Sequence, residues 1–134
     1  MSSQTPPREI QALIDAHLKG FNEQNDDLFK SVFGDTAIII DGIAPYRWLN
    51  PNAPANWLAE CEKWRVKLGV TSEHLTHKMG VCNVEGSYAY AVISGTLTVK
   101  TKTQTLVRNG QLAYTFAKRN GVWKIEAQAW ALVS

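Results

Sequence analysis

The chain has 134 residues, of which 45% are hydrophobic and 19% charged, and its formal net charge at pH 7 is +2. This length and composition predict one globular domain over residues 1–134, with a core large enough to need no disulfide staples. Because the charge is small and no basic run is longer than Lys118–Arg119, neither a nucleic acid nor an anionic membrane surface is expected as a partner.

The N-terminal segment, MSSQTPPREI, has no charged region followed by an apolar one, so no secretory signal is predicted. No apolar run approaches the roughly 20 residues that span a bilayer. Cys61 and Cys82 occur in unlike contexts, one in a helical pattern and one in a strand, and both are expected to be reduced. We therefore predict a cytoplasmic protein.

An amphipathic helix is predicted near the start of the chain. Thr5 is the expected N-cap, with Pro6 at the first helical position, where a missing N–H costs nothing. Apolar side chains then recur at helical spacing from Ile10 to Phe21. His17 falls on that apolar stripe.

A second, shorter helix is expected to begin near Asn25 or Asp26 and to end at Gly34. The segment TAIIID, residues 36–41, then predicts a short buried strand that delivers Asp41 at its end. An irregular stretch follows.

A third helix is expected from about Pro54 to Leu68, and nearly everything after it is predicted to be strand. The expected strands cover residues 73–85, 88–100, 104–118 and the last fourteen residues. Asn120–Gly121 is a strong tight-turn signal before the final strand. A bulge is expected near Asn109–Gly110, and residues 96–105 are typical of a solvated hairpin tip or a protected sheet edge.

The resulting order is α-α-β-α-β-β-β-β, an α+β pattern with helices first and an antiparallel meander after them. The apolar face of such a sheet has to be covered, and the three helices are the only elements that can cover it. We expect a strongly curved antiparallel sheet wrapped on the helices, which gives a cone with an open mouth.

The final strand carries an unusual row of small residues. Ala127, Ala129 and Ala131 share one face, and Gln128, Trp130 and Leu132 share the other, because a strand shows its two faces with a period of two. Either a helix packs closely against the alanines or their face leaves space for a ligand.

Three segments resemble the NTF2-like superfamily, in particular its SnoaL-like and ketosteroid-isomerase-like branch. They are FNEQNDDLFKSVFGDTAIIIDG (21–42), EHLTHKMGVCNVEGSYAYAV (73–92) and KRNGVWKIEAQAW (118–130). The resemblance covers nearly the whole chain. It implies a cone-shaped α+β barrel with a deep apolar pocket, and a homodimer formed through the outer face of the sheet. Members include isomerases, cyclases, dehydratases and hydrolases, but also binders without catalysis and assembly domains, so the fold does not select the function.

Asp41 is the first candidate for chemistry. By the resemblance it stands where the ketosteroid-isomerase-like members keep a general base. Independently, a carboxylate at the end of a buried apolar strand is partly desolvated, which raises its pKa toward a value useful for proton transfer. The alternative is that Asp41, followed by Gly42, caps a turn through its side chain.

His17 is the second candidate, near the position where the isomerases have a tyrosine that donates to an oxyanion. A histidine there can donate a hydrogen bond or act as acid and base near neutral pH. It departs from the family pattern, which argues against steroid isomerisation specifically, and the alternative is a satisfied core histidine. If both side chains face the cone, Asp41 and His17 form an acid/base pair.

Histidine, aromatic and alanine side chains are further candidates for the pocket wall. His74 lies where SnoaL-like sequences often have a histidine, but His77 is three residues away, so the two point to opposite faces of a regular strand. No spacing supports a metal site. Trp57 and Tyr114 are favoured as pocket walls, and Trp130, opposite the alanine row, is expected at the dimer face. In a cone, Ala127 and Ala129 form an apolar, roomy pocket floor.

Three functions remain open from the sequence. The first is an enzyme that needs no cofactor and uses Asp41 as base for isomerisation, cyclisation or dehydration of a small apolar substrate. The second is a binder of an apolar metabolite without catalysis. The third is a dimerisation or interaction domain whose pocket is filled.

Overall fold

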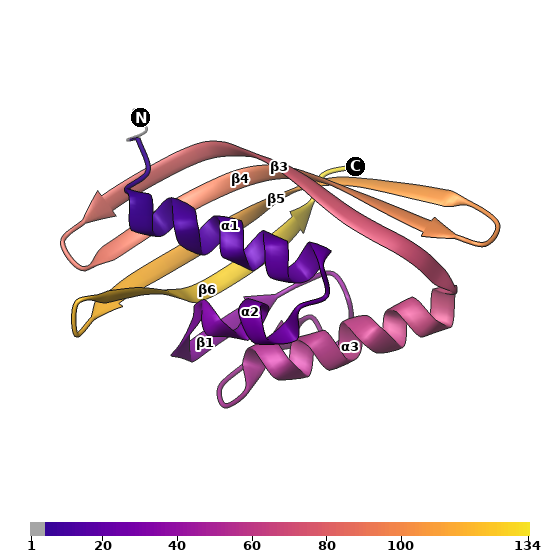
Figure 1. Ribbon diagram of the computed structural model, residues 1–134, viewed down its shortest axis with the longest axis horizontal. Helices are drawn as coiled ribbons and strands as arrows, with labels where there is room; N and C mark the ends of the chain where they lie inside the picture. Colours follow the sequence, from indigo (N-terminus) through magenta and orange to yellow (C-terminus); the bar gives the residue numbers. More distant parts are fainter. Residues whose placement is uncertain (1–4) are drawn as a thin grey trace.

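The computed structural model describes residues 5–134, which form three helices and six strands around a strongly curved sheet (Figure 1). The elements are α1 (Arg8–Asn22), α2 (Asp26–Ser31), β1 (Phe33–Ile40), β2 (Arg47–Trp48), α3 (Ala53–Leu68), β3 (Val70–Glu85), β4 (Tyr88–Thr101), β5 (Thr105–Arg119) and β6 (Val122–Leu132). Their order along the chain confirms the α+β prediction.

The sheet has the strand order β2-β1-β6-β5-β4-β3, and the helices lie on its concave side (Figure 1). All neighbouring pairs are antiparallel except β1 and β6, which are parallel. Two features differ from the expectation of a purely antiparallel sheet: this parallel pair, and β2, a two-residue strand inside the stretch expected to be irregular.

Helix α1 begins two residues later than expected, because Pro7 follows Pro6. A proline disfavours the helical conformation of the residue before it, so Pro6 stays outside the helix. Pro7 is the N-cap, and its carbonyl accepts the first helical hydrogen bond from the Gln11 N–H at 3.0 Å. Thr5 therefore caps nothing, and that part of the prediction is wrong.

Helix α2 begins as predicted but ends before Gly34. The side chain of Asn25 caps it by accepting a hydrogen bond from the Leu28 N–H. Phe33 already belongs to β1. Gly20 lets α2 lie directly on α1, because a Cβ there would come within 2.7 Å of the Phe29 backbone nitrogen.

The predicted turns are confirmed. Asn120 and Gly121 both have positive φ, 54° and 78°, which is the conformation of a tight hairpin turn. The β4–β5 connection is an exposed hairpin end. The bulge expected near Asn109–Gly110 is not there, since both residues keep regular partners in β4.

The pairing of β5 with β6 has its bulge elsewhere, in β6. Thr115 pairs with Ala127 and Phe116 pairs with Ile125, which leaves Glu126 as an extra residue in the ladder. A one-residue slip exchanges the two faces of a strand.

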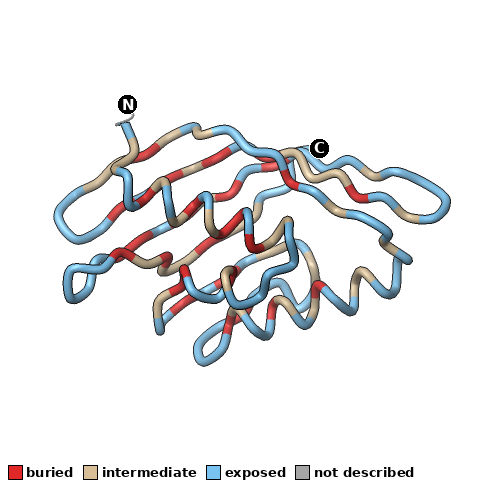
Figure 2. Tube along the Cα trace, in the orientation of Figure 1, coloured by how far each residue is buried: buried red, intermediate tan, exposed pale blue. Residues whose placement is uncertain are grey.

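Buried residues gather where the helices and the concave face meet, and the hairpin ends are exposed (Figure 2). The largest fully buried side chains include Tyr114, Phe29, Phe116, Ile10 and Ile14. Among residues 5–134, no helix has the length and apolar character that a membrane crossing requires.

Candidate functional site

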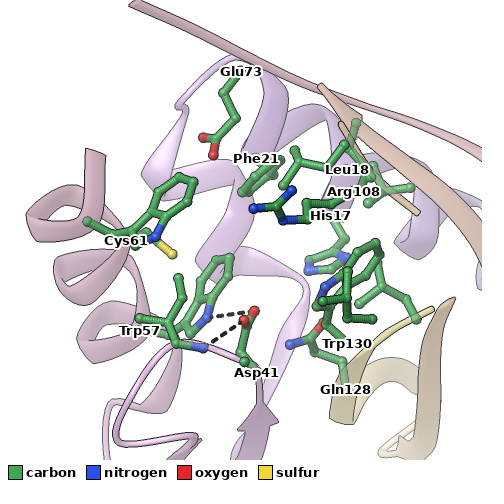
Figure 3. Close-up of a pocket in the computed structure, with 17 residues that line it drawn as sticks. His17, Leu18, Phe21, Asp41, Trp57, Cys61, Glu73, Arg108, Gln128 and Trp130 are labelled. Atoms are coloured by element: carbon green, nitrogen blue, oxygen red, sulfur yellow. Dashed lines mark hydrogen bonds between the residues drawn. The ribbon is translucent and has the colours of Figure 1, made fainter. Parts of the chain in front are cut away.

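A pocket of about 270 Å³ opens between the helices and the concave face of the sheet (Figure 3). Its wall is largely apolar, with a few polar groups set into it. The lining residues are His17, Leu18, Phe21, Asp41, Gly42, Ile43, Trp57, Cys61, Trp64, Glu73, Leu75, Leu97, Arg108, Leu112, Gln128, Trp130 and Leu132. Convergent polar groups in an apolar cavity are typical of small-molecule sites.

Asp41 follows the last residue of β1 and lies in the pocket wall beside Trp57 of α3 (Figure 3). One carboxylate oxygen accepts the Ile43 N–H and the other accepts the indole N–H of Trp57, both at 3.3 Å. Burial raises the pKa of Asp41, and the charge of Glu73 adds to this, while the N–H groups of Gly42, Ile43 and Trp57 oppose it. The turn-capping contact to Ile43 and the desolvation expected of a base are therefore both present.

His17 faces the same pocket from α1 and is 4% exposed. Its Nδ1 lies 2.7 Å from the Tyr114 hydroxyl. The phenol has no other partner among residues 5–134, so we assign its O–H as the donor to Nδ1, which leaves the ring proton on Nε2. Burial lowers the pKa of His17 to about 3, so the ring is neutral at physiological pH.

Nε2 of His17 is open to the cavity. It makes no hydrogen bond among the described residues, and none of their fully enclosed side-chain nitrogen or oxygen atoms lacks a partner. A neutral imidazole with Nε2–H exposed is a hydrogen-bond donor. This supports the donor role for His17 and argues against an acid/base role near neutral pH.

The bulge in β6 decides which of its side chains reach the pocket. Trp123 and Ile125 are buried on the concave side, and after the extra residue Glu126 the inward positions become Gln128 and Trp130. The alanine row faces outward. The expectation that Ala127 and Ala129 form the pocket floor is therefore wrong, and so is the expectation that Trp130 lies at a dimer face.

Gly110 makes room for Trp130. A Cβ at Gly110 would come within 2.5 Å of the Trp130 ring and 2.7 Å of the Ala131 carbonyl. Gly110 pairs across the sheet with Gly95, where a Cβ would also touch Trp130, at 3.5 Å. The Trp130 indole therefore packs on this glycine pair, of which only Gly110, with Asn109, was predicted from the sequence to mark a bulge.

Two further candidates lie elsewhere. Tyr114 is not in the pocket wall but behind it, 1% exposed, where it orients His17. His74 borders a separate shallow depression beside α1, together with His77 and Asp15. His77 Nε2 lies 3.7 Å from the Asp15 carboxylate. The structure thus brings together Asp41, His17 and Trp57, and leaves His74 apart.

Several pocket residues were missed by sequence reasoning, above all Gln128, Glu73 and Arg108. A signal for the first exists: the large side chains of the last strand change phase between Ile125 and Gln128, which indicates a bulge. Cys61, expected in the core, is 4% exposed and lines the pocket, and burial raises the pKa of its thiol. Among the described residues, no three or more His, Cys, Asp or Glu side chains are grouped to hold a metal ion.

Solved structures with the same fold have low sequence identity to this chain. A type 2 hexachlorocyclohexane dehydrochlorinase, LinA, is 14% identical with a TM-score of 0.80, over 94% of this chain and 84% of that one. A putative scytalone dehydratase from Novosphingobium aromaticivorans is 9% identical with a TM-score of 0.74, over 95% and 83%. An NTF2-like superfamily protein from Salmonella enterica is 16% identical with a TM-score of 0.76, over 95% and 90%.

These likenesses establish the NTF2-like fold. No curated protein matches the sequence. Residues 6–128 match the pattern of the SnoaL-like domain, which is most of the chain. The protein therefore belongs to the SnoaL-like family.

Proposed function

We propose that the protein is an enzyme that needs no cofactor and moves a proton within a small, largely apolar substrate, with Asp41 as the base. The observation that carries this proposal is the position of a partly desolvated carboxylate in the wall of an apolar pocket that also holds a neutral histidine donor. A raised pKa makes the carboxylate a stronger base, and an apolar wall protects the reacting groups from water.

The chemistry requires a substrate with a C–H bond next to a carbonyl. Asp41 takes this proton, the C–H electron pair enters a new C=C bond, and negative charge collects on the carbonyl oxygen. The Nε2–H of His17 then donates a hydrogen bond to that oxygen. Protonated Asp41 completes an isomerisation by returning the proton to another carbon, or a dehydration by protonating a departing hydroxyl as water.

Two similarly folded proteins have names that describe eliminations, a dehydrochlorinase and a putative dehydratase. Their identity to this chain is too low to transfer an activity. The fold accommodates the reaction class, and the pocket of this chain supplies the groups that such a reaction needs.

Deuterium exchange tests the proposal without knowledge of the substrate. The protein is incubated in D₂O with a panel of small cyclic ketones, and incorporation next to the carbonyl is followed by mass spectrometry. We expect exchange well above the background rate in the wild type and its loss in Asp41→Asn. Asp35→Asn, at an exposed aspartate of β1, the strand that precedes Asp41, is the matched control and should keep the activity. Equal exchange by the wild type and Asp41→Asn would contradict the proposal.

A binder without catalysis is the second candidate, because both oxygens of Asp41 already accept hydrogen bonds, which weakens the carboxylate as a base. Ligand affinity would then survive Asp41→Asn. An interaction domain with a filled interior is less well supported, since Trp57 and Trp64 line the cavity and do not fill it.

We also propose a homodimer through the outer face of the sheet. The outward alanines of β6 lie in register with Ile38 and Ile40 of β1, which are 39% and 48% exposed. Methyl groups beside exposed isoleucines form an apolar surface suited to a second copy. Sedimentation should give a dimer for the wild type and a monomer for Ile40→Lys. A monomeric wild type would contradict this proposal.

A further inference from the structure

Three charged side chains line the pocket, Asp41, Glu73 and Arg108, and they differ in how their charge is matched. Glu73 forms an ion pair with Arg65, whose Nε lies 2.8 Å from the carboxylate. The Glu73 side chain is 6% exposed and that of Arg65 is 11% exposed. Asp41 is held by Ile43 and Trp57. Arg108 has no acidic partner within ion-pair distance among residues 5–134.

Arg108 belongs to β5, opposite Leu97 of β4, and its guanidinium projects into the cavity (Figure 3). Its one side-chain hydrogen bond goes to the carbonyl of its neighbour Val107, at 3.5 Å, which is long and leaves most donors open. Arg108 is also absent from the groups that shift the pKa of Asp41. Because the residue is exposed and still lines the cavity, its charge is available at the mouth.

A second open polar group lies deeper. Gln128 is 4% exposed, and its amide has no hydrogen-bond partner among the described residues. None of their fully enclosed polar atoms is unsatisfied, so this amide must face the cavity, which Asp41 also lines. Gln128 pairs with Ile39, two residues before Asp41 on the chain, and Figure 3 labels both side chains in the wall. A buried amide is costly without a partner, and an uncharged ligand oxygen would satisfy it.

Apolar side chains separate the two polar groups. Along β5 and β6, the pair of Leu112 and Trp130 lies between Arg108 and the position of Gln128. Leu97 and Leu75 of the sheet and Leu18 and Phe21 of α1 also line the cavity. A ligand that uses both polar groups must therefore have an apolar body between them. The planar guanidinium fork matches the two oxygens of a carboxylate.

We propose that the ligand is an organic acid with a compact ring body, whose carboxylate binds Arg108 at the mouth and whose uncharged oxygen binds Gln128 beside Asp41. As a statement about substrate class, this rests on the proposed function. As a statement about binding, it can be tested without turnover.

Three naphthalene probes separate the two contacts by calorimetry: 2-naphthoate has only the acid, 2-naphthol only the hydroxyl, and 6-hydroxy-2-naphthoate both. We expect Arg108→Met to weaken both carboxylates roughly tenfold and to leave 2-naphthol unchanged. We expect Gln128→Met to weaken the two hydroxyl probes roughly fivefold and to leave 2-naphthoate unchanged. Lys102→Met, in the exposed β4–β5 turn, removes the same charge and should change nothing.

Circular dichroism and Tm establish that each variant is folded, and Arg108→Lys should restore part of the carboxylate affinity. An equal loss for all three probes in Arg108→Met would overturn the proposal, as would a wild type that binds none of them. If the wild type and Asp41→Asn both bind the probes selectively and the wild type shows no deuterium exchange, this inference stands and the proposed catalysis is wrong. If the wild type catalyses exchange but Arg108→Met does not selectively weaken the carboxylate probes, the proposed catalysis stands and this inference is wrong.

Discussion

The two faces of β6 have opposite characters although they belong to the same strand. The inward face presents Gln128, Trp130 and Leu132 to the pocket, and the outward face presents only methyl groups from Ala127, Ala129 and Ala131. The inward face lines the pocket with large and polar side chains, and the outward face carries only small ones. One extra residue, Glu126, decides which set faces in.

This difference shows how a one-residue bulge decides which side chains of a strand line the pocket. The alternation of large and small side chains determines that the strand has two unlike faces, but not which face is inside. Without the bulge, the alanines would continue the buried face that begins with Trp123 and Ile125. The pocket would then lose Trp130 and the Gln128 amide from its wall.

Deletion of Glu126 should have the largest effect, because it would exchange the inward and outward faces of β6 after residue 125. It would turn Trp130 and Gln128 outward and bring the alanines under the helices, so we expect loss of cooperative folding, at least about 5 kcal/mol. Urea unfolding followed by circular dichroism measures it. Glu126→Ala keeps the bulge and removes only a surface ion pair with Arg119, so its stability should stay close to that of the wild type. Equal stability of the two variants would show that the bulge does not set the faces.

The neutral state of His17 gives the next largest effect, as a pH dependence. Its pKa is 6.5 as a free side chain and about 3 in the fold, so the unfolded chain takes up a proton before the folded one does. Above pH 6.5 the imidazole is neutral in both states, so its burial costs no protonation energy. As the pH falls from 6.5 toward 3, only the unfolded chain is protonated, and the folded state loses stability relative to it. We expect the wild type to lose on the order of 3 kcal/mol relative to His17→Gln between pH 7 and 4.

Chemical unfolding of both proteins at several pH values measures this difference. His74→Gln, an exposed histidine, is the control and should keep the wild-type loss on acidification. If His17→Gln and the wild type lose stability in parallel, the imidazole is not buried in its neutral form.

A methyl group at Gly110 should have a smaller but clear effect. The Cβ would overlap the Trp130 ring, and we expect Gly110→Ala to cost about 2 kcal/mol and to weaken probe binding in the pocket. Gly34→Ala is the matched control, because its Cβ would meet only ordinary contacts, at 3.5 Å or more. A Gly110→Ala protein as stable as Gly34→Ala would mean that Trp130 does not lie on the glycine pair.

Much of the fold is predictable from local patterns. The apolar stripe of α1, the Asn25 cap and the Asn120–Gly121 turn each depend on residues near one another in sequence. Asp41 was found because it ends a buried strand, and His17 because it interrupts an apolar stripe.

The remaining features depend on register between distant strands. The bulge at Glu126 is defined only against Thr115 and Phe116 of β5. The role of Gly110 depends on a tryptophan from the neighbouring strand, and Arg108 is identified as a pocket residue only once β5 is paired with β4 in the curved sheet. A single sequence has no signal for such pairings beyond the phase change in its last strand.

The proposed proton transfer depends most on Asp41 being a desolvated base that is open to the pocket. A carbon-detected NMR titration of its carboxyl group tests this directly. We expect a midpoint above the ordinary value of 3.8, because burial disfavours the charged form, and a shift of the signal when 6-hydroxy-2-naphthoate is added. A midpoint at or below 3.8, with no response to the probe, would mean that Asp41 only caps its turn.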